Sequence, residues 1–219
     1  MPDGAADSGR TGAGPEDALR REALRLCDRY IAEVVLAFDL CPWAESSLRA
    51  GTVARHVVTG AEPTPADCLP VVEAWAGADG REGRTEVTVA LLVIPRFAGS
   101  RAAFDRFAEG VRRADRARRA ADAPPPFVMA AFHPAGASEF AGPAQLVSFL
   151  RRSPDPLLQL VRADALERVR SAAASVSDGI AARNHAALAR PGVTARFEAT
   201  IRALRADRDE SYRRIAVAI

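Results

Sequence analysis

Lysine is absent from this chain of 219 residues, and all 30 of its basic side chains are arginines. Schiff-base chemistry, covalent attachment of pyridoxal phosphate and the nucleotide-binding P-loop each require a lysine, so the sequence excludes all three. The 28 acidic residues nearly balance the arginines and leave a net charge of +2. A charge this small gives no reason to expect nucleic-acid binding.

Cysteines and long apolar runs are also scarce. The three cysteines, Cys27, Cys41 and Cys68, form no CxxC pair, which favours a reducing compartment over a disulfide scaffold. Apolar runs such as Val89–Ile94 are far too short to cross a bilayer, and the N-terminus lacks an apolar signal core. We therefore expect a cytoplasmic protein with no membrane association.

The length and the apolar fraction of 48% fit one globular domain. Residues 1–15 contain almost no large apolar group and predict a disordered tail. We expect a single α/β domain over residues 16–205, followed by a helical extension over residues 206–219.

Apolar periodicity predicts the elements of this domain. Apolar residues recur at helical spacing from Leu19 to Phe38, and short apolar runs bounded by Pro or Gly indicate strands. Strands that alternate with helices imply parallel pairing through right-handed crossovers. We expect an α/β fold with a small three-stranded, mostly parallel sheet (β-α-β-α-β), an N-terminal helix and a helical C-terminal half. The predicted strands are 53–58, 85–94 and 127–133, and the predicted helices are 16–39, 42–49, 64–76, 100–121, 157–175, 178–189 and 194–216.

The carboxyl edge of this sheet is the expected binding site, because ligands of open α/β sheets bind there. His133 ends the third strand and Arg96 follows the second. Ser153-Pro154-Asp155-Pro156 is typical of a helix start, which places Arg151, Arg152 and Ser153 nearby. The short helix after Cys41 runs back along the first strand, so Cys41 is predicted to lie level with the same edge.

These residues suggest two kinds of chemistry. Cys41 at a helix start is either a thiolate nucleophile with His133 as its base, or a metal ligand together with His133. Cys-Pro dipeptides also bind haem through the thiolate in some proteins. Arg96, Arg152 and Ser153 would hold a carboxylate or phosphate, with Arg162 as a further candidate.

Structural explanations compete with these roles. Cys41 also fits a small buried side chain at a turn, and His133 fits a hydrogen-bonded residue at a strand end. Ser153 fits a plain helix cap. The arginines between Arg112 and Arg119 fit a solvated helix face, and Arg183-Asn184-His185 fits the protein surface.

Four ordered blocks resemble a known bacterial family, domain of unknown function 1415, over residues 16–205. The blocks centre on Cys41, His133, the segment after Arg152, and Asn184. The resemblance implies that Cys41, His133, Arg152 and Ser153 share a pocket, and it implies no particular reaction. This chain departs from the family pattern by having Arg151 in place of Asn, Asp155 in place of Tyr and Gln159 in place of His. The blocks are Leu40-Cys41-Pro42-Trp43-Ala44, Ala131-Phe132-His133-Pro134, Arg152-Ser153-Pro154-Asp155-Pro156-Leu157-Leu158-Gln159-Leu160-Val161-Arg162, and Ile180-Ala181-Ala182-Arg183-Asn184.

The sequence therefore leads to two hypotheses of different class. The first is an enzyme that acts on a small anionic metabolite through Cys41 and His133, either by thiol catalysis or with a metal or haem. The second is a non-catalytic protein that binds a metabolite or anion, or assists another enzyme. The residue pattern predicts neither the substrate nor the oligomeric state.

Overall fold

The computed structural model describes residues 14–41, 43–78, 80, 86–136, 143–172 and 176–217. The predicted disordered tail, except for its last two residues, lies outside these ranges. None of the helices within them has the length and apolar character needed to cross a bilayer.

A four-stranded mixed sheet in the order β1-β2-β4-β3 forms the centre of the fold. Strand β1 (Val53–Val57) is parallel to β2 (Val89–Val93), and β4 (Leu157–Arg162) is antiparallel both to β2 and to β3 (Phe127–Phe132). The last residues of β1, β2 and β3 and the first residue of β4 are in register, so they meet at one edge of the sheet. This is the carboxyl edge.

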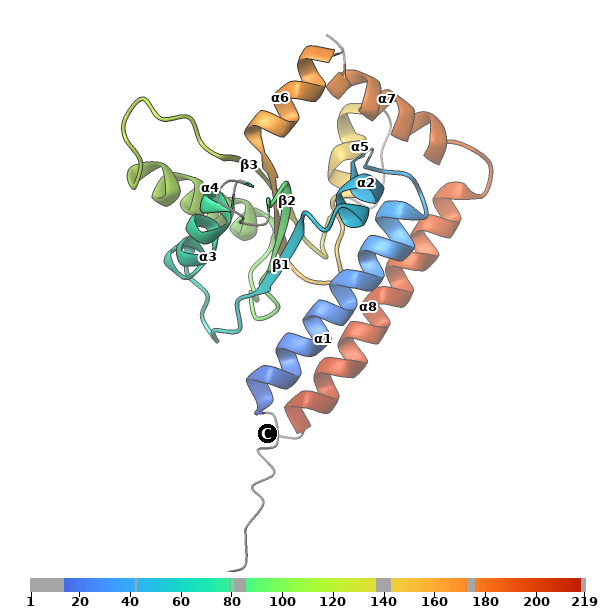
Figure 1. The fold of residues 1–219 in the computed structure, drawn as a ribbon. Coiled ribbons are helices and arrows are strands. Elements are labelled where there is room, and N and C mark those ends of the chain that lie inside the picture. The colour runs from blue at the N-terminus through green and yellow to red at the C-terminus, as the bar shows by residue number, and fades with distance from the viewer. Residues whose placement is uncertain are drawn as a thin grey trace, which may run out of the picture.

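Helices cover both faces of the sheet (Figure 1). Helices α3 and α4 lie on one face, which we call the α4 face, and α1 lies on the other, the α1 face, with α8 packed along α1. The helices are α1 (Pro15–Tyr30), α2 (Ala44–Arg49), α3 (Pro65–Gly77), α4 (Arg101–Ala117), α5 (Pro143–Leu150), α6 (Ala163–Ala172), α7 (Val176–Leu188) and α8 (Val193–Val217), with a π-helical segment η1 (Ile31–Leu36) directly after α1.

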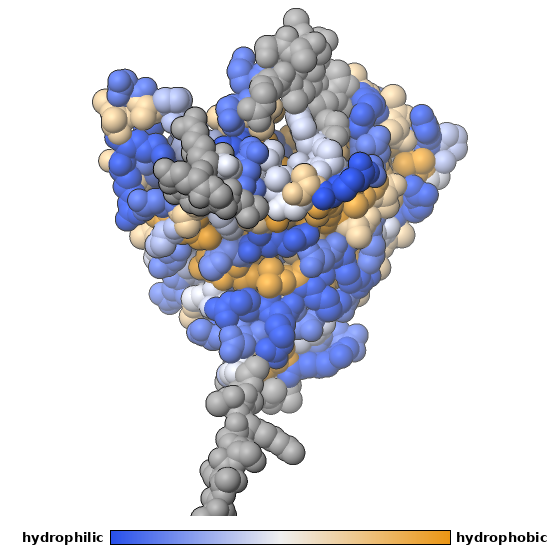
Figure 2. All heavy atoms as spheres, viewed as in Figure 1, coloured by the Kyte–Doolittle hydropathy of each residue, from blue (hydrophilic) through white to orange (hydrophobic). Residues whose placement is uncertain are grey.

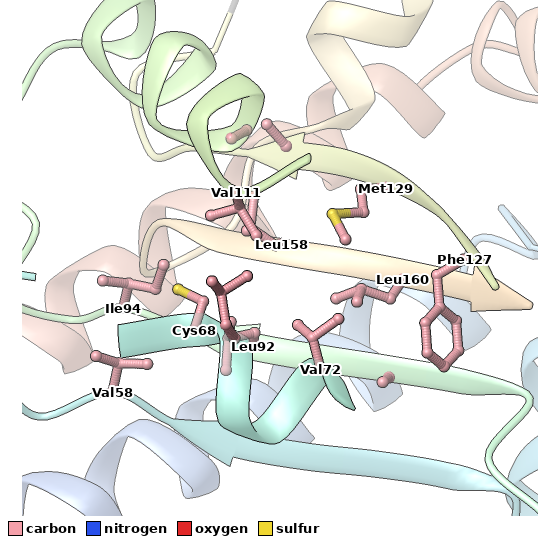
Figure 3. Packing of buried hydrophobic residues seen from close by; sticks show 14 of the residues in the cluster. Val58, Cys68, Val72, Leu92, Ile94, Val111, Phe127, Met129, Leu158 and Leu160 are labelled. Carbon is pink, nitrogen blue, oxygen red and sulfur yellow. The ribbon is translucent and has the colours of Figure 1, made fainter. Parts of the chain in front are cut away.

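The main core lies on the α4 face (Figure 3). Alternate residues of each strand point toward α3 and α4, as the two-residue period of a strand requires. Leu92 and Leu158 from the central strands meet Cys68 and Val72 from α3 and Val111 from α4. The remaining strand residues, among them Leu91 and Leu157, face α1 and pack against its buried side.

The fourth strand corrects the predicted three-stranded sheet. Leu157–Arg162 was expected to start a helix, but it forms β4 between β2 and β3, and helix α6 begins only at Ala163. The Ser-Pro-Asp-Pro signal before it forms a buried loop at the carboxyl edge. Hydrogen bonds to a strand on each side satisfy the backbone N–H and C=O groups of this apolar segment. The stabilisation from this pairing outweighs the local preference of the segment for a helix.

Two further helical segments differ from expectation. Residues 134–152 were predicted to be irregular, yet Pro143–Leu150 forms α5. The first helix was predicted to be regular up to Asp39, but it becomes π-helical at Ile31. Residues 206–217 continue α8 without a break and lie along α1.

A charged network on Asp207 joins α8 to α1. The Asp207 carboxylate accepts hydrogen bonds from Arg25 at 2.8 and 2.9 Å and another from Arg29. These hydrogen bonds, the one from Arg25 first, lower the pKa of Asp207 to about 2. A depressed carboxyl pKa stabilises the fold above the unfolded value of about 4, and this stabilisation is lost as pH falls from about 4 to about 2.

We predict that Asp207→Asn lowers the free energy of unfolding by about 1–2 kcal/mol at pH 7, after allowance for solvent screening. Urea unfolding should show the gap from wild type closing as pH falls from 4 toward 2. The control is Asp17→Asn, which removes the exposed ion pair between Asp17 and Arg20 within one turn of α1. A constant gap between Asp207→Asn and wild type from pH 7 down to pH 2 would contradict this role.

Candidate functional site

A cavity opens on the α1 face of the sheet, beside η1, α2, α5 and α7. Two adjoining hollows of about 50 and 280 Å³ make up this cavity. Figure 2 shows hydrophobic surface in the middle of the view, around β1 and α2, with hydrophilic surface beside it. The residues that line both hollows are Tyr30, Val35, Cys41, Val89, Phe132 and Gln159.

The floor of the cavity is the central strand β4. Gln159 pairs with Leu91 on one side and Ala130 on the other, so it lies in the middle of the sheet. Strand alternation directs Gln159 toward α1, whereas Leu158 and Leu160 enter the core on the α4 face. A half-buried amide in an otherwise apolar floor gives a ligand a hydrogen-bonding partner at a fixed position.

The π-helical segment forms one wall. Ile31 and Val35 from η1 both line the cavity, directly after Tyr30 at the end of α1. A π-helical turn interrupts the regular helix and changes the direction of its side chains, and such turns are frequent at functional sites. No signal in the residue pattern predicts this change, because the apolar stripe of the helix continues through it.

Cys41 also lines the cavity, at the end of a loop held by α7. Asn184 donates its Nδ2–H to the carbonyl of Leu40 at 3.1 Å, and Arg183 Nη2 donates to the carbonyl of Asp39 at 2.8 Å. Asp39 has a φ of 50°, a left-handed conformation that costs energy for a residue other than glycine. The contacts from α7 therefore hold a strained loop that places Cys41 in the cavity.

Burial raises the pKa of the Cys41 thiol, although hydrogen bonds from the backbone N–H groups of Trp43 and Ala44 oppose this effect. At neutral pH the group is therefore mainly a thiol, and it gains nucleophilicity as pH rises.

Arg151 supplies the cation of the cavity. The residue follows α5 and lines the larger hollow, with its guanidinium carbon 5.9 Å from the centre of the Phe132 ring. Within the part of the chain that the structure describes, its side chain has no ion pair and no hydrogen bond. Val147, one turn earlier, is 40% exposed and lines the same hollow. A half-buried cation thus lies among apolar groups and forms no ion pair with a described acid, although the charge of Asp105 acts on it.

His133 occupies the carboxyl edge but faces away from this cavity. Its ring packs against Phe104 of α4 at 5.8 Å between ring centres. Nδ1 accepts a hydrogen bond from the Ala135 N–H at 3.0 Å, so Nε2 carries the proton and donates to the Gly99 carbonyl at 3.1 Å. Both ring nitrogens are engaged, and burial lowers the pKa of His133.

The sheet therefore separates Cys41 from His133. The sequence placed both at one edge, but Cys41 lies on the α1 face and His133 points to the α4 face. The structure therefore does not bring Cys41 and His133 together, either as nucleophile and base or as two ligands of one metal. The described residues contain no group of three or more His, Cys, Asp or Glu side chains that could hold a metal ion.

Arg152 and Ser153 lie at the carboxyl edge as expected, but their side chains are already engaged. Arg152 is 4% exposed, pairs with both carboxylate oxygens of Glu198 at 2.7 and 3.1 Å, and donates to the Phe149 carbonyl. The Ser153 hydroxyl donates to the Asp155 carbonyl. Because β4 replaces the expected helix, no helix N-terminus stands at Ser153.

The other two predicted anion-binding arginines support the backbone. Arg96 donates to the carbonyl of Thr59 at 3.1 Å at the carboxyl edge. Arg162 lies at the far end of β4 and donates to the carbonyls of Ala76 and Ala78. Neither lines the cavity that holds Cys41.

Sequence reasoning placed Arg151 near the carboxyl edge but assigned it no role, and it missed two other polar residues of the cavity, Gln159 and Asn184. Asn184 was expected at the surface, yet it is buried and lines the larger hollow. Gln159 could have been found only if residues 157–162 had been assigned as a strand, since alternation then separates it from Leu158 and Leu160. Arg151 stands beside Arg152 in the sequence, and only tertiary structure distinguishes the paired arginine from the unpaired one.

A comparison with protein families matches residues 22–197 to the family described as Protein of unknown function (DUF1415). The chain belongs to this family. No curated protein and no solved structure matches the chain. The match covers all the residues that line the cavity, from Tyr30 to Asn184, including Arg151.

Proposed function

We propose that this family member binds a small organic anion in the cavity on the α1 face. Its anionic group would pair with Arg151, and its apolar body would lie against Phe132, Val35 and Leu146. The observation that carries the proposal is the half-buried guanidinium of Arg151, which forms no ion pair with a described residue, in a cavity of otherwise mainly apolar lining. A buried cation gains more from an anionic ligand than an exposed one does, because less water competes for it.

The size of the cavity fits a small ligand. Its larger hollow, of about 280 Å³, lies near the lower end of the range for ligand pockets, about 300–1,000 Å³. The amide of Gln159 on the floor can both donate and accept hydrogen bonds, which suits a polar atom in the middle of the ligand.

Octanoate and octanol test the proposal, since they share an apolar chain and differ in charge. We predict that octanoate binds the wild-type protein in isothermal titration calorimetry and that Arg151→Gln weakens it by about tenfold or more. Octanol should bind both proteins equally, because it makes no ion pair. Arg106→Gln removes an exposed arginine of α4 and is the control for net charge. Equal affinity of octanoate for wild type and Arg151→Gln would refute the proposal.

Thiol chemistry on the bound ligand is the second candidate. The N–H groups of Trp43 and Ala44 support it, since they favour a thiolate at Cys41. In this case His133 is not the base, and the proton of the thiol leaves to solvent or to the ligand. The Cys41→Ser variant distinguishes the two candidates. If the protein only binds the ligand, the variant should still bind it, whereas any turnover of the ligand through the thiol should be lost.

A further inference from the structure

Gln159 is a polar side chain on an apolar face of the sheet. It is half-buried in β4 and lines both hollows of the cavity on the α1 face. Its neighbours on that face, along β4, directly opposite and diagonally opposite, are apolar. They include Leu157, Val161, Leu91, Ala130, Val89 and Phe132. The amide is therefore surrounded within the sheet by groups that cannot form a hydrogen bond with it.

No hydrogen bond joins the amide of Gln159 to any other residue that the structure describes. Asn184, the other amide in the cavity lining, differs in this respect, since it donates to the Leu40 carbonyl and holds the loop before Cys41. A polar group among apolar side chains lowers stability unless it finds a partner, and a valine or leucine would avoid this cost. A bound ligand can supply the partner that the described residues do not.

The partner that suits Gln159 is an uncharged group. Arg151 is the only charged side chain among the described residues that line the two hollows. A second charged group of the ligand would lose its hydration at Gln159 without gaining a counter-ion, which is costly. A hydroxyl group is cheaper to desolvate. It can donate to the amide oxygen or accept from the amide N–H, so it suits either orientation of the amide.

Strand β3 lies between the backbones of Arg151 and Gln159. The Pro126 carbonyl accepts from the Ala163 N–H on the β4 side of the strand. The backbone groups of His133, an odd number of residues later, point to the other side, and the His133 N–H donates there to the Arg151 carbonyl at 3.0 Å. Neighbouring strands are about 5 Å apart, so at least roughly 10 Å separates the two backbones. A ligand that contacts both side chains does so with different parts of its body.

We propose that the ligand of this cavity is the anion of a hydroxy acid. Its acid group pairs with Arg151, and a hydroxyl group several carbon atoms away bonds to Gln159. The inference rests on the proposed function and narrows its ligand class. Gln159 then distinguishes the hydroxy acid from a plain fatty acid, because the fatty acid leaves the amide unpaired under its chain.

Octanoate and its hydroxy derivatives test the inference. We expect isothermal titration calorimetry to give the tighter of 6-hydroxyoctanoate and 8-hydroxyoctanoate an affinity about fivefold higher than that of octanoate, the value of about one hydrogen bond. 2-Hydroxyoctanoate carries its hydroxyl group beside the carboxylate, away from Gln159, and should bind no more tightly than octanoate.

Variants assign the preference to its residue. Gln159→Met replaces the amide by an apolar side chain of similar length, so it should abolish the preference while octanoate binds at least as tightly as to wild type. Arg151→Gln should weaken all the ligands and retain the preference. Because Gln159 has no described hydrogen-bond partner, Gln159→Met should melt no lower than wild type in circular dichroism. A lower melting temperature would show that the amide is structural and would overturn the inference.

The binding results separate the two claims. Affinities of 6- and 8-hydroxyoctanoate no higher than that of octanoate, or a preference that persists in Gln159→Met, would overturn the hydroxy-acid inference and leave the anion site at Arg151 intact. The same holds if 2-hydroxyoctanoate binds as tightly as the better of the other two isomers, since the hydroxyl group would then lie beside Arg151. Binding of every ligand unaffected by Arg151→Gln would overturn the proposed function as well.

Discussion

Replacing Arg152 by alanine will lower the free energy of unfolding by about 3–5 kcal/mol, the usual cost of removing one partner of a buried ion pair. The guanidinium of Arg152 pairs with both oxygens of Glu198 and packs on the rings of Phe149 and Phe197 at 4.0 and 5.3 Å from their centres. Its loss leaves the Glu198 charge unpaired in a largely buried place, and it removes one of the contacts between the end of α5 and α8.

Chemical unfolding of Arg152→Ala and Arg49→Ala measures this effect. Arg49 pairs with Glu45 on exposed α2, where its side chain is 75% exposed, so Arg49→Ala should change stability by about 0.5 kcal/mol or less. Arg152→Met combined with Glu198→Leu should recover part of the loss, because no buried charge is then left alone. A change of stability in Arg152→Ala no larger than that in Arg49→Ala would contradict the structural role.

Replacing His133 by alanine will lower the free energy of unfolding by about 2–4 kcal/mol, since it leaves two backbone groups unpaired and opens space beside Phe104. The two groups are the Ala135 N–H and the Gly99 carbonyl. His56→Ala is the control, because His56 is exposed on β1 and should cost far less. A stability equal to that of wild type would mean that these hydrogen bonds contribute nothing.

The same residue gives a pH dependence with a definite sign. Burial lowers the pKa of His133 below its ordinary value of about 6.5, so the folded protein favours the neutral ring. The unfolded chain then binds more protons than the folded protein below pH 6.5, and stability falls as pH is lowered through this range. Urea unfolding from pH 7.5 to 5 should show this loss in wild type and a smaller loss in His133→Ala.

The fold was predictable where local pattern and tertiary structure agree. Val89–Val93 and Phe127–Phe132 are continuous apolar runs that end at a proline or histidine, and a buried strand is the natural structure for them. Leu157–Arg162 is also mainly apolar, although it contains Gln159 and Arg162, and the Ser153-Pro154 signal before it is shared by helix starts and buried loops. The segment forms a strand because it lies between β2 and β3 and pairs with both.

The candidate site was predictable only in part for a similar reason. The carboxyl edge does gather Arg96, His133, Arg152 and Ser153, as strand direction requires. Which face a side chain takes, and whether its charge is already paired, depends on residues far away in sequence. Glu198, 46 residues after Arg152, pairs with that arginine, and no described acid forms an ion pair with Arg151.

Protection of Cys41 from alkylation tests most directly whether the cavity on the α1 face is the binding site. Cys27 and Cys68 are almost fully buried, so iodoacetamide should modify Cys41 first in the native protein. We predict that octanoate slows alkylation of Cys41 severalfold in wild type, as followed by peptide mass spectrometry, and has little effect in Arg151→Gln. Octanoate that binds in calorimetry yet leaves the alkylation rate of Cys41 unchanged would place the anion elsewhere and contradict the account.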